Sequence, residues 1–144
     1  PTRRSSDLAE PVGLAALLGV QPQEVWQAKA LLVVLENEAQ VRALRPDIPA
    51  LIALAGCAVI VTAPGDTVDF VSRYFTLDGG EDPVTGSAHC TLMPYWTARL
   101  GRHRLHAAAN CSANCKGIVR CSAAMLTCSC TGRSRCNPRL YYAG

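Results

Sequence analysis

The sequence Gly79-Gly80-Glu81-Asp82-Pro83-Val84-Thr85-Gly86-Ser87-Ala88-His89-Cys90 combines glycines, acids and a proline, and it predicts a tight turn that leads into a helix. Ser87 stands where an N-cap is expected, Arg99 lies where a cation suits the helix dipole, and Gly101 offers a C-terminal stop. Pro94 removes one amide donor from this helix, so we expect a kink there. The apolar side chains expected to be buried along it are Ala88, Cys90, Leu92, Met93, Tyr95, Trp96 and Leu100.

The start of this helix is a candidate anion site. Amides in the first turn of a helix have no intrahelical acceptor, so they can bind a carboxylate or a phosphate. Pro83 fixes the backbone beside Asp82. Gly86 lets a ligand approach the backbone, and Ser87 can cap the helix or contact the anion. A capped core helix without any ligand fits the same pattern, since short motifs also match by chance.

Three blocks follow one another in this part of the chain: Asp69-Phe70-Val71-Ser72-Arg73-Tyr74-Phe75, then residues 81–90, then Pro94-Tyr95-Trp96. In this order and spacing they resemble the second half of the PhzF-like family of phenazine biosynthesis proteins. The resemblance covers about residues 9–106. It implies an α/β (α+β) chain with the diaminopimelate-epimerase-like fold, in which each of two similar lobes curls a mixed sheet around a central helix. The helix that begins near Ser87 would be the central helix of the second lobe.

The resemblance also implies an activity. Members of this family are expected to be homodimeric isomerases or epimerases that move a proton on a small carboxylate-bearing metabolite without a cofactor or a metal. Such a reaction needs a base near the reacting carbon and donors that stabilise the developing charge. In the family the base is a glutamate of the first lobe, which has no match here because only residues 1–29 precede the first predicted strand. We therefore expect this chain to be a fragment that is inactive by itself.

Site residues carry over from the resemblance one by one. Asp82 matches the family's aspartate in the cleft, and we assign it the catalytic role of orienting the substrate or acting as an acid. Thr85 stands where related epimerases and racemases carry their second catalytic cysteine, so two-cysteine chemistry is not expected. Gly86, Ser87 and Ala88 match the anion-holding turn, and together with Thr85 they are the residues expected to bind substrate.

Three further residues near the motif have competing interpretations. Cys90 falls inside the helix and is expected to be a small buried residue rather than a nucleophile. His89 can face the cleft or be an ordinary histidine on the helix surface. Arg73 lies on a strand whose side chains alternate between two faces, so it can point toward the cleft or be a solvated or structurally paired arginine.

The composition fits one lobe. The chain has 144 residues, of which 49% are hydrophobic, so it can bury a core. Its net charge of +3 is too small to suggest nucleic acid as a partner. The longest apolar run, residues 50–63, is too short to span a membrane. No membrane partner is therefore expected, and the cytoplasm is the default location.

Apolar spacing and turn residues predict the other elements upstream of the motif. They are a short helix over 12–19 stopped by Pro22, a buried strand over 30–35, a helix capped by Asn37 and continuing through Leu44, a helix over 48–54, a buried strand over 59–61 and a strand over 68–75. A turn at 63–66 separates the last two.

The leader, residues 1–8, has no apolar period and is expected to be non-native or disordered. The alternative is an export signal, with Arg3 and Arg4 as its charged start and residues 12–20 as its apolar core. Asp7 and Glu10 interrupt that pattern.

The tail, residues 107–144, holds six of the eight cysteines and shows neither helical nor strand periodicity. A frameshift is the preferred interpretation, which would make the tail aberrant or disordered. Disulfides would require an oxidising compartment. Zinc would require paired cysteines at a short spacing, and Cys111 and Cys115 could make one such pair. The alternative function is accordingly a small anion-binding module, not an enzyme, with a zinc-binding cysteine tail.

Overall fold

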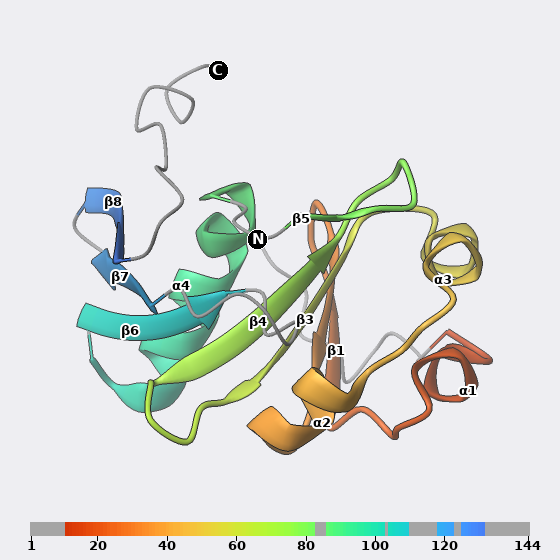
Figure 1. Cartoon of the computed structure of the whole chain (residues 1–144), viewed down its shortest axis with the longest axis horizontal. Helices are drawn as coiled ribbons and strands as arrows, with labels where there is room; N and C mark the ends of the chain where they lie inside the picture. Colours follow the sequence, from red (N-terminus) through yellow and green to blue (C-terminus); the bar gives the residue numbers. More distant parts are fainter. Residues whose placement is uncertain (1–10, 83–85, 103, 110–117, 123–124, 132–144) are drawn as a thin grey trace.

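A mixed sheet separates the helices of this protein into two groups, with α4 on one face and α1, α2 and α3 toward the other (Figure 1). The computed structural model describes residues 11–82, 86–102, 104–109, 118–122 and 125–131. The helices are α1 (Leu14–Leu18), α2 (Glu38–Ala43), α3 (Ile48–Ala55) and α4 (Gly86–Leu100). The strands are β1 (Glu24–Gln27), β2 (Leu31–Val34), β3 (Val59–Pro64), β4 (Phe70–Phe75), β5 (Glu81–Asp82), β6 (Arg104–Ala109), β7 (Ile118–Ser122) and β8 (Met125–Thr131).

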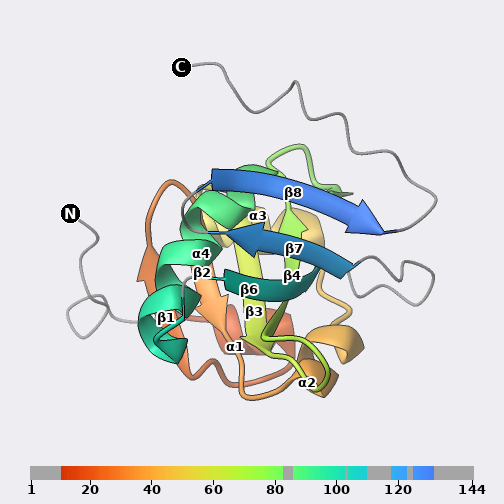
Figure 2. The same ribbon diagram turned by 90° about the vertical axis from the view of Figure 1, so that its left-hand side faces the viewer.

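The strand order is β1-β2-β3-β4-β6-β7-β8, and β5 adds to β4 outside this path. The pairs β2–β3 and β4–β6 are parallel, and the other pairs are antiparallel. Strand β4 pairs with β6 through residues 70–72 and with β5 through Tyr74 and Phe75. The short strand β5 therefore continues the edge of β4 just beyond the end of β6. Figure 2 shows β6, β7 and β8 in sequence beside α4.

Each face of the sheet carries its own apolar core. One core lies between the sheet and α4 and includes Phe70, Leu92 and Trp96. The other lies under the remaining helices and includes Val71 and Phe75. Neighbouring residues of β4 thus belong to opposite cores, which confirms the alternation predicted for this strand.

Polar caps and glycines set the helix ends close to where the sequence predicts them. The side chain of Asn37 accepts a hydrogen bond of 2.9 Å from the amide of Gln40, and Asp47 does the same for Ala50 at 3.1 Å. Gly56 and Gly101 end α3 and α4 with φ of 66°. Helix α1 ends at Gly19, before the Pro22 that was predicted to stop it.

Two strands, β7 and β8, fall within residues 107–144, although the sequence of this tail shows no strand periodicity. Strand β7 pairs with β6, and β8 pairs with β7. Strand formation depends on pairing with an available strand edge as much as on side-chain alternation. The edge of β6 offers hydrogen-bonding partners to β7, so β7 forms without a strong pattern of its own. The origin of the tail in a frameshift stays a prediction. In the described part of the chain, no helix is long and apolar enough to cross a membrane.

Candidate functional site

The candidate site lies where β5 is followed by the start of α4. Asp82 ends β5 and is half-buried, and Gly86 begins α4. The four residue steps from Asp82 to Gly86 span at most about 14 Å, which limits how far Asp82 can lie from the start of α4. Of the predicted site residues, the structure describes Asp82, Gly86, Ser87 and Ala88, which lie close together in the sequence. Thr85, the remaining one, lies outside the described residues.

The first turn of α4 has a mixed character. Ser87 is exposed and is the second residue of α4, two positions beyond the N-cap position that was predicted for it. Ala88 is buried in the core beneath the helix. Exposed Ser87 and the amides of the first turn are therefore the groups available to a ligand, whereas the side chain of Ala88 serves packing.

The register of β5 decides which way Asp82 faces. Asp82 pairs with Tyr74, and Glu81 pairs with Phe75. Residues directly opposite each other in an antiparallel pair share a face of the sheet. Tyr74 packs against the core beneath α4, whereas Phe75 belongs to the opposite core. Asp82 therefore lies on the face that carries α4, and Glu81 lies on the other face.

The buried side of α4 is anchored to the centre of the sheet. The Nε1 group of Trp96 donates a hydrogen bond of 3.0 Å to Oγ1 of Thr62 on β3. The ring of Trp96 also stacks on Phe70 of β4, with centroids 5.5 Å apart. These contacts fix the helix relative to β3 and β4, and so they also position its first turn.

Two predictions for α4 need correction. Cys90 is exposed, not buried. It is two residues from both Ala88 and Leu92, which line the core, and a two-residue step crosses to the opposite side of a helix. His89 is only 2% exposed and lies beside Phe70, with ring centroids 6.5 Å apart, so the interpretation as a helix-surface histidine is wrong. Pro94 lies inside α4 as predicted, and the expected kink stays a prediction.

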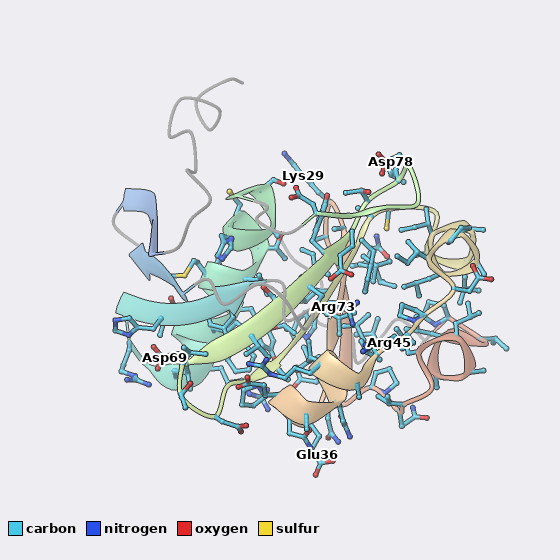
Figure 3. All side chains as sticks on the ribbon, in the orientation of Figure 1. Lys29, Glu36, Arg45, Asp69, Arg73 and Asp78 are labelled. Atoms are coloured by element: carbon cyan, nitrogen blue, oxygen red, sulfur yellow. The ribbon has the colours of Figure 1, made fainter. Side chains whose placement is uncertain are left out.

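Arg73 is structurally paired, which is one of the two alternatives that its strand position allowed. Its guanidinium donates to both carboxylate oxygens of Glu81, with Nε and the second nitrogen each at 2.7 Å. The side chain is only 6% exposed and lies on the side of β4 that faces α2 and α3 (Figure 3). Glu81 was not predicted as a functional residue. Its position directly before Asp82 is the sequence feature that could have indicated it.

A second polar cluster joins the other end of α4 to β1, away from the candidate site. Glu24 accepts hydrogen bonds from Trp26 at 3.0 Å and from Tyr95 at 3.2 Å, and it forms an ion pair with Arg99. Burial raises the pKa of Tyr95 to about 12, and the Glu24 carboxylate adds to this shift. Burial also acts to raise the pKa of Glu24, but hydrogen bonds from Arg99 and Trp26 outweigh it and hold that pKa below its ordinary value.

Within the described residues, no group of three or more histidines, cysteines or acids lies together in a way that could hold a metal ion. The zinc alternative depends on the cysteines of residues 107–144, whose side chains lie outside what the structure describes. It therefore stays a prediction.

Comparison with known proteins gives a consistent match. The family model of the PhzC-PhzF phenazine biosynthesis-like proteins matches residues 5–118, which extends beyond both ends of the predicted resemblance. An uncharacterised isomerase of Pseudomonas aeruginosa is 49% identical over 116 residues, which cover 78% of this chain and 44% of that protein.

Solved structures match as well. A PhzF-family protein of Enterococcus faecalis is 39% identical with a TM-score of 0.74, and the match covers 84% of this chain and 46% of that one. A PhzC/PhzF protein of Clostridium difficile is 37% identical with a TM-score of 0.69, covering 80% and 44% of the two chains. The chain thus spans less than half the length of each of these relatives.

Proposed function

This chain belongs to the PhzC-PhzF family of phenazine biosynthesis-like proteins, and on that premise we propose that it supplies one side of the active site of an isomerase that moves a proton on a small carboxylate-bearing metabolite. The predicted diaminopimelate-epimerase-like fold with a mixed sheet is confirmed by the similarity to PhzF-family structures. The isomerase class is supported by the relative from Pseudomonas aeruginosa. The reaction and substrate class are the proposal.

One observation carries the proposal: Asp82 lies on the α4 face of the sheet, within a few residues of the first turn of α4. The amides of that turn have no acceptor within the helix and, together with exposed Ser87, suit a substrate carboxylate. Gly86 at the first helical position leaves room for the substrate beside the backbone. Asp82 then orients the reacting part of the substrate or acts as an acid, and the same amides stabilise negative charge as the proton leaves.

The base that removes the proton is proposed to come from the part of the relatives' length that this chain does not span. Proton transfer of this kind needs no cofactor. The family resemblance supports a homodimer for the whole protein. By this proposal the described residues hold and orient the substrate, and the chain by itself does not turn it over.

Deuterium exchange tests the proposal in two steps. The chain alone, incubated in D2O with small amino and hydroxy acids, is expected to give no deuterium incorporation, and measurable incorporation would overturn the claim of inactivity. A chimera that joins this chain to the remaining part of the Pseudomonas aeruginosa relative is expected to exchange its substrate.

In that chimera, Asp82→Asn is expected to lower kcat/KM about 100-fold or more, in line with the loss of a general acid or a substrate-orienting group. Asp78→Asn is the matched control, because Asp78 is an exposed acid at the tip of the loop between β4 and β5 (Figure 3). An Asp82→Asn chimera with unchanged kcat/KM would refute the role given to Asp82.

A further inference from the structure

Strand β5 is too short to hold its own register securely. It has two residues, and it pairs with β4 only through Tyr74 and Phe75. A slip of one residue in a strand turns every side chain to the opposite face of the sheet. Such a slip would move Asp82 away from α4 and place Glu81 there instead.

The turn before β5 brings the chain back to β4 and places Gly80 opposite Thr76, in the register in which β5 pairs with β4. The amide of Thr76 donates to the carbonyl of Gly80 at 2.9 Å, and the amide of Gly79 donates to the carbonyl of Thr76 at 3.0 Å. Gly79 adopts a φ of 81°, which favours glycine. The bond between Thr76 and Gly80 sets the register with which the chain enters β5, and side-chain contacts of β5 can then reinforce it.

The contact between Arg73 and Glu81 acts within β5 itself. Two parallel hydrogen bonds of 2.7 Å join the guanidinium to the carboxylate, and this bidentate geometry fixes direction as well as distance. Arg73 is on the face opposite to α4, as is Phe75, over whose ring its guanidinium carbon lies at 5.2 Å from the centroid. Glu81 can reach this guanidinium only when its side chain is on the same face.

Arg73 is itself held from a third direction. Its remaining terminal nitrogen donates to the carbonyls of Val41 at 3.2 Å and Leu44 at 2.9 Å, at the C-terminal end of α2. These carbonyls lack partners within the helix, and the negative end of the helix dipole favours a cation. Contacts with α2 therefore hold the guanidinium independently of Glu81. When Glu81 binds this guanidinium, the position of β5 is restrained as well.

We propose that Arg73 and Glu81 are a positioning pair for the active site: their ion pair stabilises the register that the turn sets for β5 and thereby holds Asp82 on the face of α4. This inference rests on the proposed function, which gives Asp82 its contact with substrate. Neither Arg73 nor Glu81 touches the substrate in this arrangement. Both act through Asp82, from the opposite side of the sheet.

The test compares variants of the full chain by NMR. Glu81→Gln keeps the side-chain length and removes the charge. Arg73→Lys keeps the charge but removes the planar pair of donors that binds both carboxylate oxygens. Both are expected to lose the cross-strand NOE contacts between Tyr74 and Asp82. Glu38→Gln is the matched control, because Glu38 is likewise paired with an arginine, Arg42, but lies on α2. It is expected to keep those contacts.

A double variant guards against simple unfolding. Arg73→Met combined with Glu81→Leu removes both charges, so no unpaired buried charge remains. It is expected to fold, with its other amide signals in place, and still to lose the contacts between Tyr74 and Asp82. Contacts that persist in a folded double variant, or in folded Glu81→Gln and Arg73→Lys, would overturn the proposal.

A titration with lactate separates this inference from the proposed function. In the unchanged chain, lactate is expected to shift the amide signals of residues 86–88, and Glu81→Gln is expected to weaken that binding about ten-fold, equivalent to a lost interaction of about 1.4 kcal/mol. Absence of lactate binding in the unchanged chain would count against the proposed function alone. The NOE contacts would still decide the positioning role.

Discussion

The indole nitrogen of Trp96 donates a 3.0 Å hydrogen bond to Oγ1 of Thr62, and that hydroxyl in turn donates a 2.7 Å bond to the carbonyl of Val71. All three residues are buried. One hydroxyl group therefore links α4 to β3 and β4 in the core beneath the helix. A buried polar chain of this kind is stable only while every member keeps its partner.

Replacing the hydroxyl tests this link. Thr62→Val keeps the branched shape but leaves the indole N–H of Trp96 without its acceptor, so the free energy of unfolding is expected to fall by about 1–3 kcal/mol. Urea unfolding followed by circular dichroism measures the change. Thr62→Ser keeps the hydroxyl and is expected to cost less. Equal losses for the two variants would contradict the importance of the hydrogen bond.

The two sides of α4 are expected to respond very differently to truncation. Leu92→Ala removes a side chain that is fully buried beneath the helix, and it is expected to lower the free energy of unfolding by about 2–5 kcal/mol. Cys90→Ala, on the exposed side of the same helix, is expected to change it by no more than about 0.5 kcal/mol. Thermal unfolding of both variants tests the correction made for Cys90. A large loss of stability for Cys90→Ala would contradict the exposed position of Cys90.

Local signals predicted the elements that carry strong patterns of their own. The continuous apolar run of β2 and the Asn37 cap of α2 are readable because each depends on residues next to one another in the chain. Strands β1 and β5 were missed. Their four and two residues are too few to show a period, and they form because a partner strand lies beside them.

The site was predictable to a similar extent and for a similar reason. The motif places Asp82 and residues 86–88 together because they are close in sequence. The role of Arg73 depends on Glu81 and on two carbonyls of α2, about thirty residues away, so a local pattern cannot distinguish pairing from exposure to the cleft. Cys90 was predicted to be buried because its side chain is apolar. Its position in the helix is opposite to that of Ala88 and Leu92, which line the core, so it is exposed.

The tyrosine at the far end of α4 is expected to titrate late. Burial and the neighbouring Glu24 carboxylate raise the pKa of Tyr95 to about 12 from its ordinary value of 10.0. Absorbance of the tyrosinate as the pH rises should show one group that ionises near this value, and Tyr95→Phe should remove it. Ionisation of every tyrosine near pH 10 in the folded chain would contradict the environment described.

The same shift predicts how stability depends on alkaline pH. The folded-state pKa of Tyr95 is raised, so the folded chain holds this proton more tightly than the unfolded chain does. The stabilisation is complete below about pH 10 and is lost as the pH rises toward about 12. Between these values, the free energy of unfolding should fall more steeply for the unchanged chain than for Tyr95→Phe. Parallel pH dependences would contradict the prediction.

An acid-side counterpart is expected at Glu38, which lies buried at the start of α2. Burial acts to raise its pKa, but the hydrogen bond of 2.8 Å from the amide of Asp66 and the contact with Arg42 outweigh it, so the pKa lies below its ordinary value. A depressed pKa stabilises the fold above the unfolded value of about 4.5, and this stabilisation is lost as the pH falls through the folded pKa.

Glu38→Gln should therefore lower the free energy of unfolding at neutral pH by about 1–3 kcal/mol and flatten its decline in acid. Glu36→Gln, an exposed neighbour, is the control and should leave both nearly unchanged. Chemical unfolding measured from neutral pH down to about pH 3 compares the two. If the Glu38→Gln chain loses stability in acid as steeply as the unchanged chain, the carboxylate of Glu38 does not join α2 to the turn before β4.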